Sequence, residues 1–150
     1  MTRPISRQDP RLEAWKAFLR AHARVIRALE LELQAEQEMA LTDYDVLVQL
    51  AAADERRLRM SELADALLLS RSGVTRLVDR LVAEGLVERV TCESDRRGQW
   101  ASLTDAGHER LRRASPTHLR GVAEHFLDRL SESDLAALER MLEPIVNAGR

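Results

Sequence analysis

The chain has 150 residues, a length that suggests one domain, or one compact domain with helical extensions. Apolar residues make up 45% of it, enough for a hydrophobic core, whereas aromatic residues make up only 3%, which argues against an aromatic base-stacking surface for RNA. The single cysteine, Cys92, excludes an internal disulfide and a cysteine-built zinc finger. No apolar run approaches the roughly 18 residues of a membrane helix and no signal-peptide pattern opens the chain, so we expect a cytoplasmic protein with no membrane partner.

The formal net charge is −2, which argues against a general nucleic-acid coat, but the charge is unevenly distributed. Residues 56–98 carry nine basic and seven acidic groups, whereas the segments before and after them carry more acidic than basic groups. The excess of positive charge therefore lies in the middle of the chain.

A long N-terminal helix is predicted over residues 10–37, because apolar positions recur there at steps of three and four. They are Leu12, Trp15, Leu19, His22, Ile26, Leu29 and Leu33. A helix this long at the start of a small protein rarely buries its whole apolar face within its own chain, so we expect a partner subunit to cover it.

Three short helices follow, with Thr42, Ser61 and Ser70 as the expected N-caps. Between the first two, the charged segment 54–57 reads as a turn. The third of these helices has one apolar face and is expected to stop at Gly85. Its apolar residues are Val74, Leu77, Val78 and Leu81.

Residues 86–92, "LVERVTC", and residues 99–104, "QWASLT", have the β-branched composition and alternation of strands, and "ESDRRG" between them reads as a turn. Two helices joined by a tight turn and followed at once by a hairpin make a winged helix-turn-helix. In such a fold the second helix can enter a major groove while the hairpin reaches the neighbouring minor groove.

Two further helices complete the chain. Thr104 is expected to cap the first, in which Ser115-Pro116 is either a kink or a fresh N-cap, and Ser131 is expected to open the second. The predicted fold is mainly α with a small β-hairpin wing. Its parts are an N-terminal dimerisation helix (1–40), a winged helix-turn-helix lobe (41–104) and C-terminal dimerisation helices (105–150). The residues expected at the dimer interface are Leu12, Leu19, Leu135, Leu138, Leu142 and Ile145.

The stretch that begins "SRSGVTR" at Ser70 places polar side chains on the outer face of its helix. Arg71 and Arg76 can read guanine edges or bind phosphate, and Ser72 and Thr75 can contact either. The free N–H groups and the partial positive charge of a helix N-terminus also favour phosphate. The alternative is a solvated helix end that carries two arginines.

Asp95, Arg96 and Arg97 lie where the hairpin must turn. An arginine at a projecting tip suits the narrow, electronegative minor groove of A·T-rich DNA. Asp95 opposes DNA binding unless it orients an arginine. A solvated charged turn is the alternative, but the preceding helix-turn-helix favours DNA.

The order "LSRSGVTRLVDRLVAEGLVER…DRRG…ASLTDAG" resembles the signature of the MarR family, bacterial transcription regulators of the multiple-antibiotic-resistance type. The resemblance extends from about Leu41 to Gly107, and the flanking helices agree in number and length. It implies a two-fold symmetric dimer that binds a pseudopalindromic operator in double-stranded DNA.

By position, the resemblance implies that Ser72, Thr75 and Arg76 address major-groove bases and that Arg97, held by Asp95, addresses the minor groove. Arg71 and Arg96 would be supporting phosphate contacts. Members of the family commonly release DNA when a small, often aromatic and anionic ligand binds. The candidates for such a pocket are Trp15, Asp65 and Arg110, in faint resemblance to the urate-responsive branch of the family. The alternative is that Trp15 packs in the apolar seam of its helix and that Asp65 and Arg110 form a structural ion pair.

The expected function is therefore a homodimeric repressor released by a small effector, with no cofactor and no metal site. The four histidines show no metal-ligand spacing in sequence, and Cys92 is expected to be an ordinary strand residue. A winged lobe that docks protein in place of DNA is the alternative from another class, and the arginines at both reading positions count against it. An enzyme is not expected, because no nucleophile–base pair, phosphate loop or paired acids are present.

Overall fold

The computed structural model describes residues 4–91 and 98–148, and they form two compact units. One unit, here called the lobe, is Glu32–His118. The other, here called the helical unit, combines the residues up to Leu31 with those from Leu119 onward. No helix among the described residues is both long enough and apolar enough to span a membrane.

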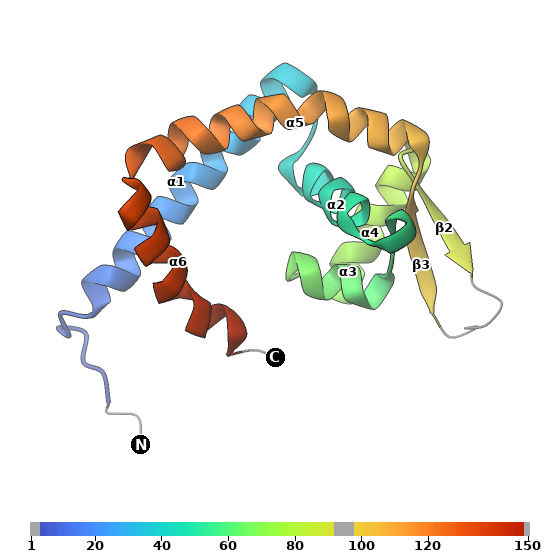
Figure 1. Ribbon diagram of the computed structural model, residues 1–150. Helices are drawn as coiled ribbons and strands as arrows, with labels where there is room; N and C mark the ends of the chain where they lie inside the picture. Colours follow the sequence, from blue (N-terminus) through green and yellow to red (C-terminus); the bar gives the residue numbers. More distant parts are fainter. Residues whose placement is uncertain (1–3, 92–97, 149–150) are drawn as a thin grey trace. The chain divides into compact units, whose positions relative to one another are not determined.

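In the described part of the lobe, residues 32–91 and 98–118, there are three short helices and a three-stranded sheet (Figure 1). The helices are α2 (Leu41–Ala52), α3 (Met60–Leu67) and α4 (Arg71–Ala83), and the strands are β1 (Arg57–Arg59), β2 (Val87–Thr91) and β3 (Gln99–Leu103). A short 3-10 turn, η1 (Asp54–Arg56), precedes β1. The lobe also holds the end of α1 (Leu12–Gln37) and the first part of α5 (Asp105–His125).

The sheet is antiparallel, with β3 between β1 and β2. Val87 of β2 pairs with Leu103 and Thr91 pairs with Gln99, which makes the predicted hairpin. On its other edge β3 pairs with β1, where Arg59 lies opposite Trp100. The strand β1 was not expected from the sequence, which had suggested a charged turn over residues 54–57.

The core of the lobe is aliphatic and comes from every one of these helices. Burying each of its side chains contributes about 1.5–3 kcal/mol. Those with no more than 1% exposure include Leu33, Val46, Leu47, Leu50, Leu63, Val74, Val78 and Leu81. The buried face predicted for residues 74–81 is therefore confirmed.

Two of the expected N-caps are wrong and three are confirmed, one of them Thr104, whose hydroxyl accepts from the Gly107 N–H at 3.0 Å at the start of α5. Helix α2 begins at Leu41 after Ala40, and α3 begins at Met60 after Arg59, so neither Thr42 nor Ser61 is a cap. Ser70 does cap α4, since its hydroxyl accepts from the Gly73 N–H at 3.1 Å. Ser131 caps α6 (Glu132–Asn147) by accepting from the Asp134 N–H at 3.1 Å.

Helix α5 passes through Pro116 without a break, so Ser115 opens no new helix. The Ser115 hydroxyl donates instead to the Leu111 carbonyl at 2.8 Å. The helical unit holds the rest of α5, the 3-10 turn η2 (Leu127–Arg129) and α6, together with the first part of α1.

Candidate nucleic-acid interface

The first turn of α4 displays the polar side chains that the sequence placed there. Arg71, Ser72, Thr75 and Arg76 are all exposed, while the opposite face of the helix is buried. Because Ser70 satisfies the Gly73 N–H, the helix begins at a fixed residue and its first turn is well defined. Arg71 and Arg76 form no ion pair with any described residue. Both guanidinium groups can therefore contact an anionic partner.

The hydroxyl groups of this turn have local partners. The Thr75 hydroxyl donates to the Arg71 carbonyl at 2.9 Å, and the Ser72 hydroxyl lies 3.2 Å from that of Ser70. Both hydroxyl oxygens keep acceptor capacity toward solvent. The hydrogen bonds thus orient the two side chains without occupying them completely.

Helix α4 is fixed to its surroundings by two ion pairs made from its later turns. The Arg80 guanidinium donates to the carboxylate of Asp43, which is buried in α2, and this hydrogen bond raises the pKa of Arg80. Asp79 accepts from Arg89 of β2 at 2.7 Å. Asp79 faces outward, but its carboxylate is held by the hairpin. The two pairs orient α4 relative to α2 and to the wing.

The three-stranded sheet contributes residues that the sequence did not suggest. Arg89 also donates to the side-chain oxygen of Gln99. The guanidinium carbons of Arg57 and Arg59 lie 5.3 Å and 5.2 Å from the centroid of the Trp100 ring. In the sequence, the two arginines of "RLR", residues 57–59, are separated by one leucine, which would place both arginines on one face of a strand. This pattern can be interpreted only once β1 is known to pair with β3.

The expected wing-tip residues, Asp95, Arg96 and Arg97, lie outside the described residues, as does Cys92. Their roles remain predictions.

The candidate effector residues do not form a single cluster within one unit. Trp15 lies on α1 in the helical unit and is 55% exposed, whereas Asp65 and Arg110 belong to the lobe. Within the described part of the lobe, Arg110 donates to the Gln37 carbonyl at the end of α1 and makes no ion pair with Asp65. The Arg110 side chain therefore caps a helix C-terminus, and the alternative interpretation of Asp65 and Arg110 as a structural ion pair is wrong.

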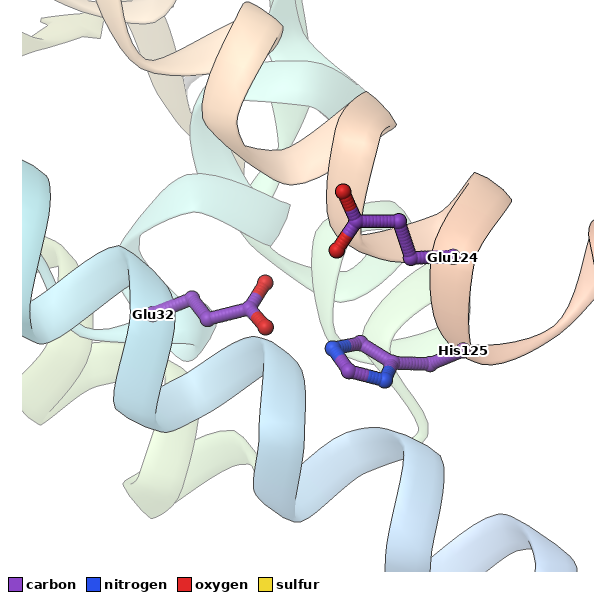
Figure 2. Close-up of side chains that lie close together, drawn as sticks. All are labelled: Glu32, Glu124 and His125. Atoms are coloured by element: carbon purple, nitrogen blue, oxygen red, sulfur yellow. The ribbon is translucent and has the colours of Figure 1, made fainter.

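Potential metal ligands are also divided between the units. Glu124 and His125 end α5 in the helical unit, whereas Glu32 of α1 belongs to the lobe (Figure 2). Neither unit by itself brings three metal-ligating side chains together, as far as residues 4–91 and 98–148 are concerned.

Comparison with known proteins identifies the family. Residues 38–98 match the sequence model of the MarR family. The structure of AbsC from Streptomyces coelicolor, a MarR family transcriptional regulator, is 37% identical and superposes with a TM-score of 0.88, covering 98% of this chain and 97% of that one. This chain belongs to the MarR family.

Two other relatives bear on function. Sco3205 from S. coelicolor, a MarR family transcriptional regulator solved in complex with DNA, is 34% identical with a TM-score of 0.88, over 98% of this chain and 91% of that one. The transcriptional repressor MprA of Escherichia coli is 37% identical over 106 residues, which are 71% of this chain and 60% of MprA. The aligned segment thus spans less than two thirds of MprA. The predicted fold, a mainly helical winged helix-turn-helix, is confirmed.

Proposed function

We propose that this protein is a DNA-binding transcription regulator that acts as a homodimeric repressor on a pseudopalindromic operator. The observation that carries the proposal is the first turn of α4, where Arg71 and Arg76 project from a capped helix end without an acidic partner among the described residues. A relative of the same fold has been solved in complex with DNA, and another relative is a named repressor.

In this proposal α4 is the recognition helix. Ser72, Thr75 and Arg76 contact bases in the major groove, and Arg71 contacts the backbone. At the wing, Arg97 contacts the minor groove with Asp95 orienting it, and Arg96 binds phosphate. In the dimer, two lobes bind half-sites about 10–10.5 base pairs apart, centre to centre.

Selection of bound fragments from genomic DNA, followed by affinity measurements on the recovered operator, tests the proposal. Arg76→Ala is expected to lose the preference for operator over unrelated DNA, because a guanidinium that reads a base supplies discrimination. Arg97→Ala is expected to weaken binding more evenly across sequences. Both variants should remain dimeric in sedimentation. If neither substitution changes affinity for the operator, these roles are wrong.

The same measurements distinguish DNA binding from the alternative in which the winged lobe binds a protein in place of DNA. Association with DNA must weaken steeply as salt rises, because each phosphate contact releases condensed counterions. A lobe that binds a protein partner and leaves operator DNA unshifted at low salt would support the alternative.

For release from DNA we propose a small aromatic anion, with Trp15, Asp65 and Arg110 as candidate contacts. Titration of the protein–operator complex with urate and with benzoate, followed by fluorescence anisotropy, tests this step. If the ligand releases operator DNA from the wild type but not from Trp15→Ala, this step is supported. If DNA release is unchanged when all three residues are substituted, the ligand binds at another site.

A further inference from the structure

Arg59 occupies a junction between the sheet and the helix-turn-helix. It is the last residue of β1 and the residue before α3, and its backbone N–H donates to the Glu62 carboxylate at 2.9 Å. Its guanidinium carbon lies 5.2 Å from the centroid of the Trp100 ring, on the facing strand position. Both the backbone and the charged group of Arg59 are therefore held in place, the latter by a cation–π contact.

The Arg59 side chain also lines a surface cleft of about 310 Å³ beside the recognition helix. The other walls of the cleft include Arg71 and Thr75 of α4, together with Gln99, the first residue of β3. Among the described residues that line it there are two guanidinium groups and no carboxylate. The cleft thus joins the start of α3, the first turn of α4 and the wing in one cationic surface.

We propose that Arg59 and Arg71 bind one phosphate of the DNA backbone at this cleft, and that Trp100 is the positioning residue that orients Arg59 toward it. The inference rests on the proposed function, since it places the phosphate beside the helix that reads the operator. Arginine presents several N–H donors in a planar fork that fits phosphate oxygens, and stacking on an aromatic ring leaves the in-plane N–H groups able to donate. Contacts of this kind fix the register of a protein on the duplex without reading sequence.

Arg57 offers a matched control on the same ring. Its guanidinium carbon lies 5.3 Å from the Trp100 centroid, almost as near as that of Arg59. Arg57, however, is not among the residues that line the cleft. Loss of either arginine removes one cation–π contact, but only loss of Arg59 removes a charge from the cleft.

The test measures the affinity of purified Arg59→Ala, Arg57→Ala and Arg76→Ala variants for operator and for unrelated DNA over a series of salt concentrations. Arg59→Ala is expected to weaken both kinds of binding by about tenfold and to lower the slope of log affinity against log salt by about one. Arg57→Ala is expected to stay within about twofold of the wild type with an unchanged slope. Arg59→Lys, which keeps the charge but not the fork, should preserve the slope and recover part of the affinity.

Trp100→Phe and Trp100→Leu test the positioning role. Each should weaken DNA binding when Arg59 is present and have no further effect when Arg59 is alanine, because the ring acts through that side chain. A merely structural tryptophan would weaken binding equally in both backgrounds, and that result would overturn the positioning role. Trp100→Phe retains an aromatic ring, so it still tests the positioning role if Trp100→Leu does not fold.

Unchanged affinity and slope for Arg59→Ala, alongside lost operator preference for Arg76→Ala, would overturn this inference and leave the proposed function intact. Unchanged binding in both variants would instead contradict the proposed recognition face. Titration of the free protein with inorganic phosphate provides another arm. Phosphate binding that depends on Arg59, combined with a normal DNA salt slope in Arg59→Ala, would assign the cleft to a small anion and overturn the proposal.

Discussion

The side chain of His118 shows how the environment of one residue sets its chemistry. Its ring lies 4.4 Å, centroid to centroid, from that of Tyr44, and its Nδ1 is buried without a hydrogen-bond partner in the described structure. Burial lowers the pKa of His118, because the charged imidazolium loses hydration that nothing replaces. The folded lobe therefore favours the neutral imidazole.

This environment predicts an acid-sensitive stability. Since the pKa of His118 is lower in the folded chain than the 6.5 of the unfolded chain, the unfolded chain binds more protons between the two values. The contribution of neutral His118 is fully present above pH 6.5 and is lost as the pH falls through the folded pKa. Chemical denaturation at several pH values should show a smaller loss of unfolding free energy in His118→Phe than in the wild type. His22→Gln, at an exposed histidine of α1, should keep the wild-type loss.

At the scale of single residues, the sequence could indicate the exposed face of α4 but not Arg59. The arginines and hydroxyls after Ser70 follow a helical repeat whose buried side is plainly apolar, so their exposure is a local property. The position of Arg59 depends on Trp100, 41 places further along the chain and reached only through strand pairing. Arg59 is the last residue of a three-residue strand, so no local repeat in the sequence indicates that its side chain faces a cleft.

At the scale of elements, long periodic segments were predictable and short ones were not. Helix α4 and the hairpin match their expected positions, since each has a clear repeat and a turn or cap at its boundary. The strand β1 has only three residues and is stabilised by its pairing with β3, so local sequence could not reveal it. The wrong caps, Thr42 and Ser61, each lie inside the first turn of a helix that starts one residue earlier, so a capping residue type alone does not fix a boundary.

The junction of α4, β3 and α5 explains the "LTDAG" segment and makes a stability prediction. The Thr104 hydroxyl donates to the Gly85 carbonyl at 2.7 Å and accepts from the Gly107 N–H at 3.0 Å. A Cβ atom on Gly107 would lie 2.0 Å from the backbone oxygen of Leu86, which cannot move aside without shifting the chain. Gly107→Ala is therefore expected to lower the free energy of unfolding by about 2–4 kcal/mol, measured by urea denaturation.

Gly73→Ala provides the comparison for that prediction. A Cβ atom on Gly73 would lie 3.2 Å from the Ser70 hydroxyl oxygen, a side-chain atom that can rotate, and alanine gains about 1 kcal/mol of helix propensity over glycine. Its stability should stay within about 1 kcal/mol of the wild type. If Gly107→Ala proved as stable as Gly73→Ala, the close approach of α5 to Leu86 would be contradicted.

At the scale of the whole molecule, the helical unit exposes large apolar side chains on both α1 and α6, and such side chains gathered on one face are typical of an interaction surface. Met141, Ile145 and Val146 on α6 are 64–71% exposed, and on α1 Trp15 and Phe18 are about half exposed. The sequence predicted such faces, because α1 and α6 both carry apolar repeats and a helix as long as α1 rarely buries its whole apolar face within its own chain. Whether a second copy contacts the six residues expected at the dimer interface depends on a symmetry that one chain does not contain, so that assignment stays a prediction.

A second copy covering these faces predicts that one charge on α6 will dissociate the protein. Ile145→Glu places a carboxylate on the expected interface, where it would lose hydration without a partner, so the dimer should weaken by at least tenfold in analytical ultracentrifugation. Ala136→Glu adds the same charge at an exposed position on the opposite, polar side of α6 and should leave the dimer intact. Because two lobes must bind two half-sites together, Ile145→Glu should also lose most of its affinity for a full operator while keeping that for an isolated half-site. An Ile145→Glu variant that sediments as a dimer would exclude this face of α6 from the interface, and a wild-type protein that sediments as a monomer at all concentrations would contradict the dimer itself.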